Sequence, residues 1–168
     1  MGSGDVFGWD GVVGSSLPTG VSPRGGESGR VLNIARGEIG VKELTGKNDG
    51  VRIEQYLKYT GLPKGHAWCA SFVSWVFGQA GYKQPRTAWS PALFPASKLV
   101  KVGKPGDVIG IYFKDLGRIA HVGLVEMDRG NYIQTIEGNT ASDGGRDGNA
   151  VHRRLRLKKT ISKYADWL

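Results

Sequence analysis

Cysteine is almost absent from this sequence, since Cys69 is the only one in 168 residues. A single cysteine excludes a disulfide within the chain, so the redox state of the compartment cannot be inferred from it. No apolar run approaches the ~18 residues that cross a bilayer, and no membrane-spanning segment is predicted. Residues 1–29 lack a positive start followed by an apolar block, so no signal peptide is predicted either.

Acidic residues are scarce relative to basic ones: 15 Asp and Glu stand against 23 Lys and Arg, a formal net charge of +8. This excess favours an anionic partner. Arg154, Arg156 and Lys158 alternate along one predicted strand, as either an anion-binding surface or a charged, solvated edge. No aromatic residue is interleaved with the basic ones over 151–159, so nucleic acid is not a predicted partner.

The first part of the chain is rich in small residues, with nine glycines and five serines over 1–29. Such a segment cannot bury enough apolar surface to offset the entropy lost on ordering. The composition therefore predicts a linker or disordered tail over 1–28 and one folded domain over 29–168.

Hydrophobic periodicity divides the domain into a helical half and a strand half. Helices are predicted over residues 30–39, 51–59 and 69–80, the first capped by Ser28. Four prolines make residues 82–105 irregular, with one helical turn near 91–98. Alternating strands are predicted over residues 107–113, 119–126, 131–137 and 150–157. Helices followed by an antiparallel meander make an α+β fold.

Cys69 stands at the predicted start of the third helix, which leaves two interpretations open. It is in phase with the apolar residues Phe72, Val73 and Val76, which favours an inert core cysteine. A thiol in the first turn of a helix is also exposed to unpaired backbone N–H groups, which favour the thiolate and make a nucleophile.

A cysteine nucleophile needs a base, and the base needs an orienting group. His121 lies within the second predicted strand. If Asp128–Gly130 is a three-residue hairpin loop, His121 lies directly opposite Glu137 on one face of the sheet. Asn139 follows two residues later as a further polar partner or an oxyanion donor. The order Cys69, His121, Glu137 favours catalysis over packing.

Five short motifs together resemble the CHAP domain, the cysteine, histidine-dependent amidohydrolase/peptidase family of the NlpC/P60 and papain-like group. They lie at residues 39–50 (IGVKELTGKNDG), 68–73 (WCASFV), 105–107 (PGD), 120–123 (AHVG) and 136–139 (IEGN). The tail of the match, from Gly144–Arg146 to Val151–Arg154, is similar to phage-associated and secreted bacterial members.

The resemblance implies a papain-like α+β fold and hydrolysis of amide bonds in peptidoglycan, either as an N-acetylmuramoyl-L-alanine amidase or as a stem or cross-bridge endopeptidase. By motif position, Cys69 is the nucleophile, His121 the base, Glu137 the orienting acid and Asn139 an auxiliary polar residue. Trp68 and His66, next to the cysteine in sequence, are predicted to bind substrate.

No cofactor is predicted. Some CHAP domains bind calcium near the start of the domain, but Glu43, Asn48 and Asp49 are too few hard oxygen ligands. Three scattered histidines and one cysteine lack the spacing of a metal site. The resemblance implies action at the bacterial cell wall, on peptidoglycan and near anionic wall polymers, by a monomer or one module of a longer protein. The alternatives are an inactive wall-binding module and a papain-like amidase with a non-wall substrate.

Overall fold

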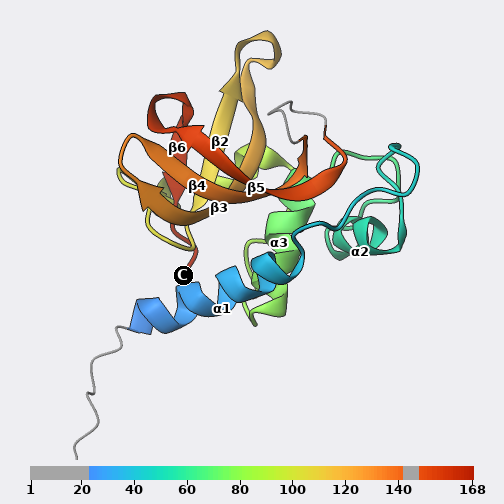
Figure 1. Cartoon of the computed structure of the whole chain (residues 1–168), viewed down its shortest axis with the longest axis horizontal. Helices are drawn as coiled ribbons and strands as arrows, with labels where there is room; N and C mark the ends of the chain where they lie inside the picture. The colour runs from blue at the N-terminus through green and yellow to red at the C-terminus, as the bar shows by residue number, and fades with distance from the viewer. Residues whose placement is uncertain (1–22, 142–147) are drawn as a thin grey trace, which may run out of the picture.

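The computed structural model describes residues 23–141 and 148–168, and its helices precede its sheet in the chain (Figure 1). The helices are α1 (Pro23–Gly37), α2 (Val51–Tyr59) and α3 (Cys69–Gln79). Short 3-10 turns are η1 (Ser90–Leu93), η2 (Ala96–Lys98), η3 (Lys114–Leu116) and η4 (Lys158–Thr160). The strands are β1 (Leu99–Val100), β2 (Val108–Phe113), β3 (Arg118–Arg129), β4 (Tyr132–Thr140), β5 (Ala150–Leu157) and β6 (Lys163–Ala165). The predicted α+β class is confirmed.

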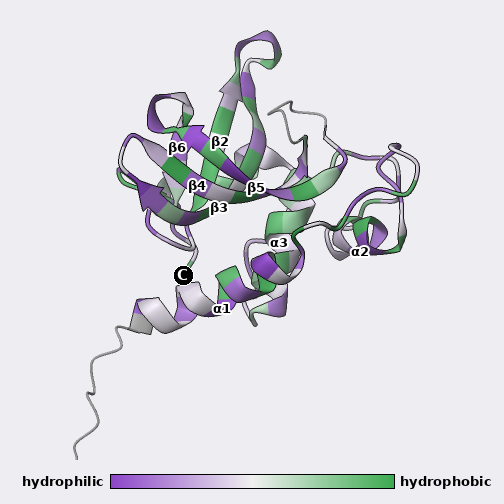
Figure 2. Cartoon of the chain, in the orientation of Figure 1, coloured by the Kyte–Doolittle hydropathy of each residue, from purple (hydrophilic) through white to green (hydrophobic). Residues whose placement is uncertain are grey.

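The six strands form one antiparallel sheet in the order β1-β6-β2-β3-β4-β5. The run β2-β3-β4-β5 is the predicted meander. The sequence did not predict β1 and β6, which have two and three residues and are too short to show a period. The strands carry alternating hydrophobic and hydrophilic bands (Figure 2), as expected of a sheet whose two faces differ.

The main core lies between the sheet and the helices, and α3 packs against β3 and β4. A smaller cluster of Ile109, Val125 and Ile133 occupies the other face. Val108 belongs to the first core and its neighbour Ile109 to the second, because successive side chains of a strand point to opposite faces.

The first helix begins earlier than predicted. It starts at Pro23, so Ser28 lies within the helix instead of capping it, and its Oγ donates to the Gly25 carbonyl. Arg24 forms ion pairs with Asp107 (2.5 Å) and Asp166 that tie this first turn to the second half of the chain. Tertiary contacts thus stabilise a glycine-rich segment that helix propensity disfavours. Residues 1–22 of the predicted linker, and Gly144–Arg146 of the resemblance, lie outside the described residues.

The predicted three-residue loop Asp128–Gly130 is wrong. Arg129 pairs with Tyr132, which leaves a two-residue turn, Gly130-Asn131, between β3 and β4. Gly130 has a φ of 73°, as required of the first central residue of the tight turns that join antiparallel strands.

A β-bulge at Glu126 shifts the register once more between the turn and the other end of the hairpin. As a result, Leu124 lies opposite Ile136. In this register His121 and Glu137 are offset by two residues instead of directly opposite. An offset of two keeps both side chains on one face of the sheet. The shorter turn and the bulge therefore compensate, and the predicted shared face is retained.

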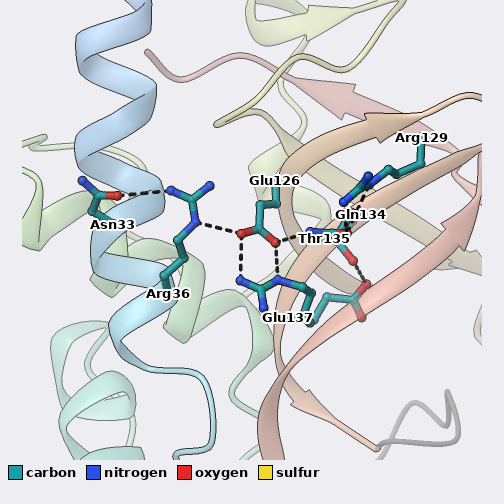
Figure 3. A network of polar contacts seen from close by, with 8 residues as sticks. Asn33, Arg36, Glu126, Arg129, Gln134, Thr135 and Glu137 are labelled. Atoms are coloured by element: carbon teal, nitrogen blue, oxygen red, sulfur yellow. Dashed lines mark hydrogen bonds and ion pairs between the residues drawn. The ribbon is translucent and has the colours of Figure 1, made fainter.

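Glu126, the bulge residue, joins α1 to the sheet (Figure 3). Its carboxylate accepts from Arg36 of α1 at 2.8 Å, from Arg153 of β5 at 2.5 and 2.9 Å, and from Gln134 of β4 at 2.9 Å. Burial opposes its charge, but the hydrogen bonds from Arg153, Arg36 and Gln134 outweigh burial and lower the pKa of Glu126 to about 2.

We expect Glu126→Gln to lower the free energy of unfolding at pH 7 by about 1–3 kcal/mol, because glutamine replaces one of the two acceptor oxygens with an NH2 donor and removes the charge that pairs with two guanidinium groups. A lowered pKa contributes stability above the ordinary value near 4.5 and loses it as the pH falls toward 2. The difference between wild type and variant should therefore shrink from pH 5 to pH 2.5. Urea unfolding at several pH values measures it. The exposed Asp115→Asn is the control, and an equal effect in both variants contradicts the prediction.

Candidate active site

Cys69 is the first residue of α3, and its side chain is nearly buried, with 5% exposed. Its Sγ lies 3.6 Å from the Oγ of Ser90, the first residue of η1. The first backbone N–H groups of a helix have no partner within the helix, so the thiol lies in a field that favours negative charge. Cys69 is thus both part of the core and placed at a helix start.

His121 of β3 and Glu137 of β4 are in direct contact. The Nε2 of His121 lies 2.7 Å from an oxygen of Glu137, and the two residues are 1% and 0% exposed. An ionised carboxylate only accepts, so Nε2 carries a proton and donates it. A Cβ atom at position 123 would come within 2.5 Å of the Glu137 Cγ. Gly123 therefore provides the space in which Glu137 lies beside the histidine.

Every acceptor direction of the Glu137 carboxylate is used. Oε1 accepts from Thr135 Oγ1 at 2.6 Å and from Arg156 Nε at 2.8 Å. Oε2 accepts from Arg156 Nη2 at 2.6 Å and from His121. Figure 3 shows Thr135 and Glu137 next to each other along β4. A buried carboxylate is stable only when paired in this way, so Arg156 and Thr135 fix the acid that orients His121.

The charges of Cys69 and His121 support each other. Burial by itself would raise the pKa of the thiol, but hydrogen bonding and the charge of His121 outweigh burial and lower the pKa of Cys69 below its ordinary value of 9.0. Burial by itself would lower the pKa of the imidazole, but Cys69 and Glu137 raise the pKa of His121 to about 9. Burial also opposes the charge of Glu137, and Arg156 followed by His121 lowers its pKa well below 4.5. These shifts favour the thiolate over the thiol and the imidazolium over the neutral ring.

The three alternating basic residues predicted as an anion-binding surface or a solvated edge all have partners within the protein. Arg154 donates through Nη1 to the Ala141 carbonyl at 2.8 Å. Arg156 binds Glu137, and Lys158 lies 2.7 Å from Asp128. Arg156 is therefore a residue of the candidate site, which sequence reasoning missed because basic residues alternating on a terminal strand look like a solvated face. Ser90 was also missed, since it lies in the proline-rich stretch that shows no period.

Asn139 lies at the start of α3 and not at the His121 ring. Its Oδ1 accepts from the backbone N–H of Trp68 at 3.1 Å, and its Nδ2 donates to the Gly148 carbonyl at 2.6 Å. These contacts give Asn139 a positioning role for the cysteine helix. Its direct part in the chemistry stays a prediction.

Trp68 lies in the core, which corrects the prediction that it contacts substrate. Its side chain is 0% exposed, and its indole N–H donates to Glu43 at 2.9 Å. The indole packs against the rings of Tyr56 and Phe72, with centroids 5.6 and 6.5 Å away. The residue directly before the cysteine is therefore anchored in the core.

The residues weighed for calcium are engaged with protein donors. Both Glu43 oxygens accept hydrogen bonds, from the Trp68 indole and the Asn48 N–H, and both Asp49 oxygens accept from Thr45. Within the described ranges, no group of three or more His, Cys, Asp or Glu side chains is placed to hold a metal ion. These residues do not fit the six to eight oxygen ligands of calcium.

A cleft of about 240 Å³ opens beside Cys69. The described residues that line it are Leu62, His66, Ala67, Cys69, Ala88, Trp89, Ser90, Arg118 and Ala120. His66 is exposed and lies on this cleft, and its predicted role in substrate binding stays a prediction. Cys69 itself is among the residues that line the cleft.

An α+β fold thus carries a buried Cys-His-Glu group at the junction of a helix start and an antiparallel sheet. Residues 61–139 match the model of the CHAP domain family, which confirms the resemblance found in the sequence motifs. The matched segment includes Cys69, His121 and Glu137. CHAP domains are generally hydrolases that act on cell-wall amides, so the match indicates an amidase or peptidase related to peptidoglycan.

A search of curated proteins found no match. Among solved structures, the chain is similar to one titled "The crystal structure of Ly7917", with 16% sequence identity and a TM-score of 0.47. The similarity covers 82% of this chain and 60% of that one. Within residues 23–141 and 148–168, no helix is long and apolar enough to cross a membrane.

We expect the alkylation rate of Cys69 by iodoacetamide to rise with a midpoint pH below that of the same cysteine in the unfolded protein. The pKa of Cys69 is lowered chiefly by His121 against the effect of burial, so His121→Ala should move the midpoint upward. Rates are normalised to their plateau to remove the effect of access, and the urea-unfolded protein gives the reference. A wild-type midpoint at or above that of the urea-unfolded protein, or one unchanged in a folded His121→Ala variant, contradicts the prediction.

Proposed function

We propose that this protein hydrolyses an amide bond of peptidoglycan through an acyl-enzyme on Cys69. The observation that carries the proposal is the buried group of Cys69, His121 and Glu137. His121 favours the charged forms of Cys69 and Glu137, and both of them favour the charged form of His121. A cysteine that only packs in the core does not require a buried histidine nearby whose Nε2 lies 2.7 Å from the oxygen of a carboxylate with all its acceptors filled. Perturbed pKa values beside a cleft are typical of catalytic groups.

In the first half of the reaction, the Cys69 thiolate attacks the carbonyl carbon of the amide. A C–S bond forms as the carbonyl π electrons move to oxygen, and the backbone N–H of Cys69 at the start of α3 stabilises the oxyanion. The His121 imidazolium then protonates the amide nitrogen as the C–N bond breaks. The amine leaves, and a thioester on Cys69 remains.

In the second half, neutral His121 takes a proton from water, and the resulting hydroxide attacks the thioester carbonyl. The C–S bond breaks with its electron pair on sulfur, which restores the thiolate and the imidazolium and releases a carboxylic acid. Glu137 keeps Nε2 protonated throughout, so that the other ring nitrogen, Nδ1, exchanges the proton.

We also propose that the fold is papain-like, with the cysteine at the start of a helix packed on an antiparallel sheet. The catalytic unit is the domain proposed over 29–168, extended toward Pro23 by the first turns of α1, and residues 1–22 are proposed as a linker. The family match implies action on the cell wall. Secretion and delivery by a phage or as a toxin are the routes consistent with this site of action.

Two other functions make different predictions. An inactive wall-binding module would bind sacculi without releasing new termini, and its thiol would react no faster than a free cysteine. A papain-like amidase with a non-wall substrate would have the reactive thiol but leave sacculi intact. The lowered pKa of Cys69 argues against the first, and the family match argues against the second.

Incubation with purified sacculi of several wall chemistries should release new amine and carboxyl termini, identified by mass spectrometry. Cys69→Ala removes the nucleophile and should reduce release by at least about 1,000-fold. Circular dichroism checks that this variant is folded, and exposed Asp115→Asn is the matched control. Full activity in folded Cys69→Ala would exclude the mechanism, and intact sacculi of every chemistry would exclude the substrate class.

A further inference from the structure

The cleft beside Cys69 has an uneven charge. Arg118 is the one arginine or lysine among the described residues that line it, and none of these lining residues is acidic. His66 is the other lining residue with an ionisable nitrogen. An anionic group on a substrate would therefore meet a cation and no opposing carboxylate in this cleft.

Arg118 is held in place by an aromatic ring. Its guanidinium carbon lies 4.3 Å from the ring centroid of Trp89, which is 53% exposed. Its Nη1 donates to the Ile119 carbonyl at 3.1 Å, and within the described ranges Nε and Nη2 have no protein acceptor. A guanidinium stacked in this way keeps its planar fork oriented and free for a carboxylate.

The chain fixes this pair relative to the nucleophile. Arg118 precedes His121 by three residues on β3, a separation of about 10 Å along a strand. Trp89 directly precedes Ser90, whose Oγ contacts the Cys69 Sγ. The stack therefore lies within about three extended peptide residues of the position of a scissile carbonyl.

We propose that Arg118, stacked on Trp89, binds a free carboxylate of the substrate and selects amides that carry one close to the scissile bond. This inference rests on the proposed amidase function and narrows its substrate class. Peptidoglycan stem peptides carry carboxylates that are either free or amidated, and only the free form accepts both N–H groups of a guanidinium fork. Arg118 is then a specificity-determining residue.

Two synthetic muramoyl stem peptides that differ only in a free or amidated carboxylate on the second residue provide the test. We expect wild type to cleave the free form with a kcat/KM at least about tenfold higher, and Arg118→Gln to reduce that ratio to near one. Arg118→Lys keeps the charge but loses the fork, so its ratio should lie between the two. A ratio that Arg118→Gln leaves unchanged, or an equal loss on both substrates, overturns the proposal.

The matched control is Arg86→Gln. Arg86 also stacks on a ring, with its guanidinium carbon 4.6 Å from the centroid of Tyr59, and it donates to the Tyr59 carbonyl, but it does not line the cleft. This variant should keep the wild-type ratio. If Arg86→Gln loses it as Arg118→Gln does, the preference reflects overall charge, and the assignment to Arg118 is wrong.

Binding separates this inference from the proposed function. Calorimetry with folded Cys69→Ala protein should show tighter binding of the free form, by at least about tenfold, and the preference should disappear in Cys69→Ala/Arg118→Gln. That result supports the carboxylate site even where wild type cleaves neither peptide, which would count against the proposed function alone. Equal binding of the two peptides, or no binding of either at millimolar concentration, overturns the carboxylate site.

Discussion

The paired carboxylate of Glu137 is the interaction on which the candidate site depends. A buried ionised acid is costly unless its acceptors are filled, and here Arg156, Thr135 and His121 fill them. Because Arg156 keeps Glu137 ionised, Glu137 holds His121 in one orientation and raises its pKa. His121 in turn lowers the pKa of Cys69 against the effect of burial. The reactivity of one thiol thus depends on an arginine from the edge strand β5.

A second polar cluster fixes Trp68, the residue before Cys69. Glu43 accepts from the Trp68 indole, and Asn139 accepts from the Trp68 backbone, so the residue before Cys69 is fixed by two hydrogen bonds and by the core. Glu137 and Asn139 lie two residues apart on β4. One strand therefore orients His121 through Glu137 and positions the start of α3 through Asn139.

Periodicity and motif spacing predicted α2, the start of α3 and the central meander, because these elements are long enough to show a pattern. The hairpin was predicted with the wrong turn, yet His121 and Glu137 still share a face, since the bulge at Glu126 offsets the shorter turn. Other features depend on contacts between distant residues and have no local signal. The ion pairs of Arg24 extend α1, and the reach of Arg156 to Glu137 is visible only in the folded sheet.

The central claim is that His121 is an imidazolium paired with the Cys69 thiolate at neutral pH. A pH titration of ¹⁵N-labelled histidine followed by NMR tests it directly, because the ring nitrogens report both charge and tautomer. We expect His121 to titrate near pH 9 with Nε2 protonated throughout, and to titrate at lower pH in Cys69→Ala, where the thiolate is lost. A ring that titrates near its ordinary value of 6.5 and does not respond to Cys69→Ala would contradict the account.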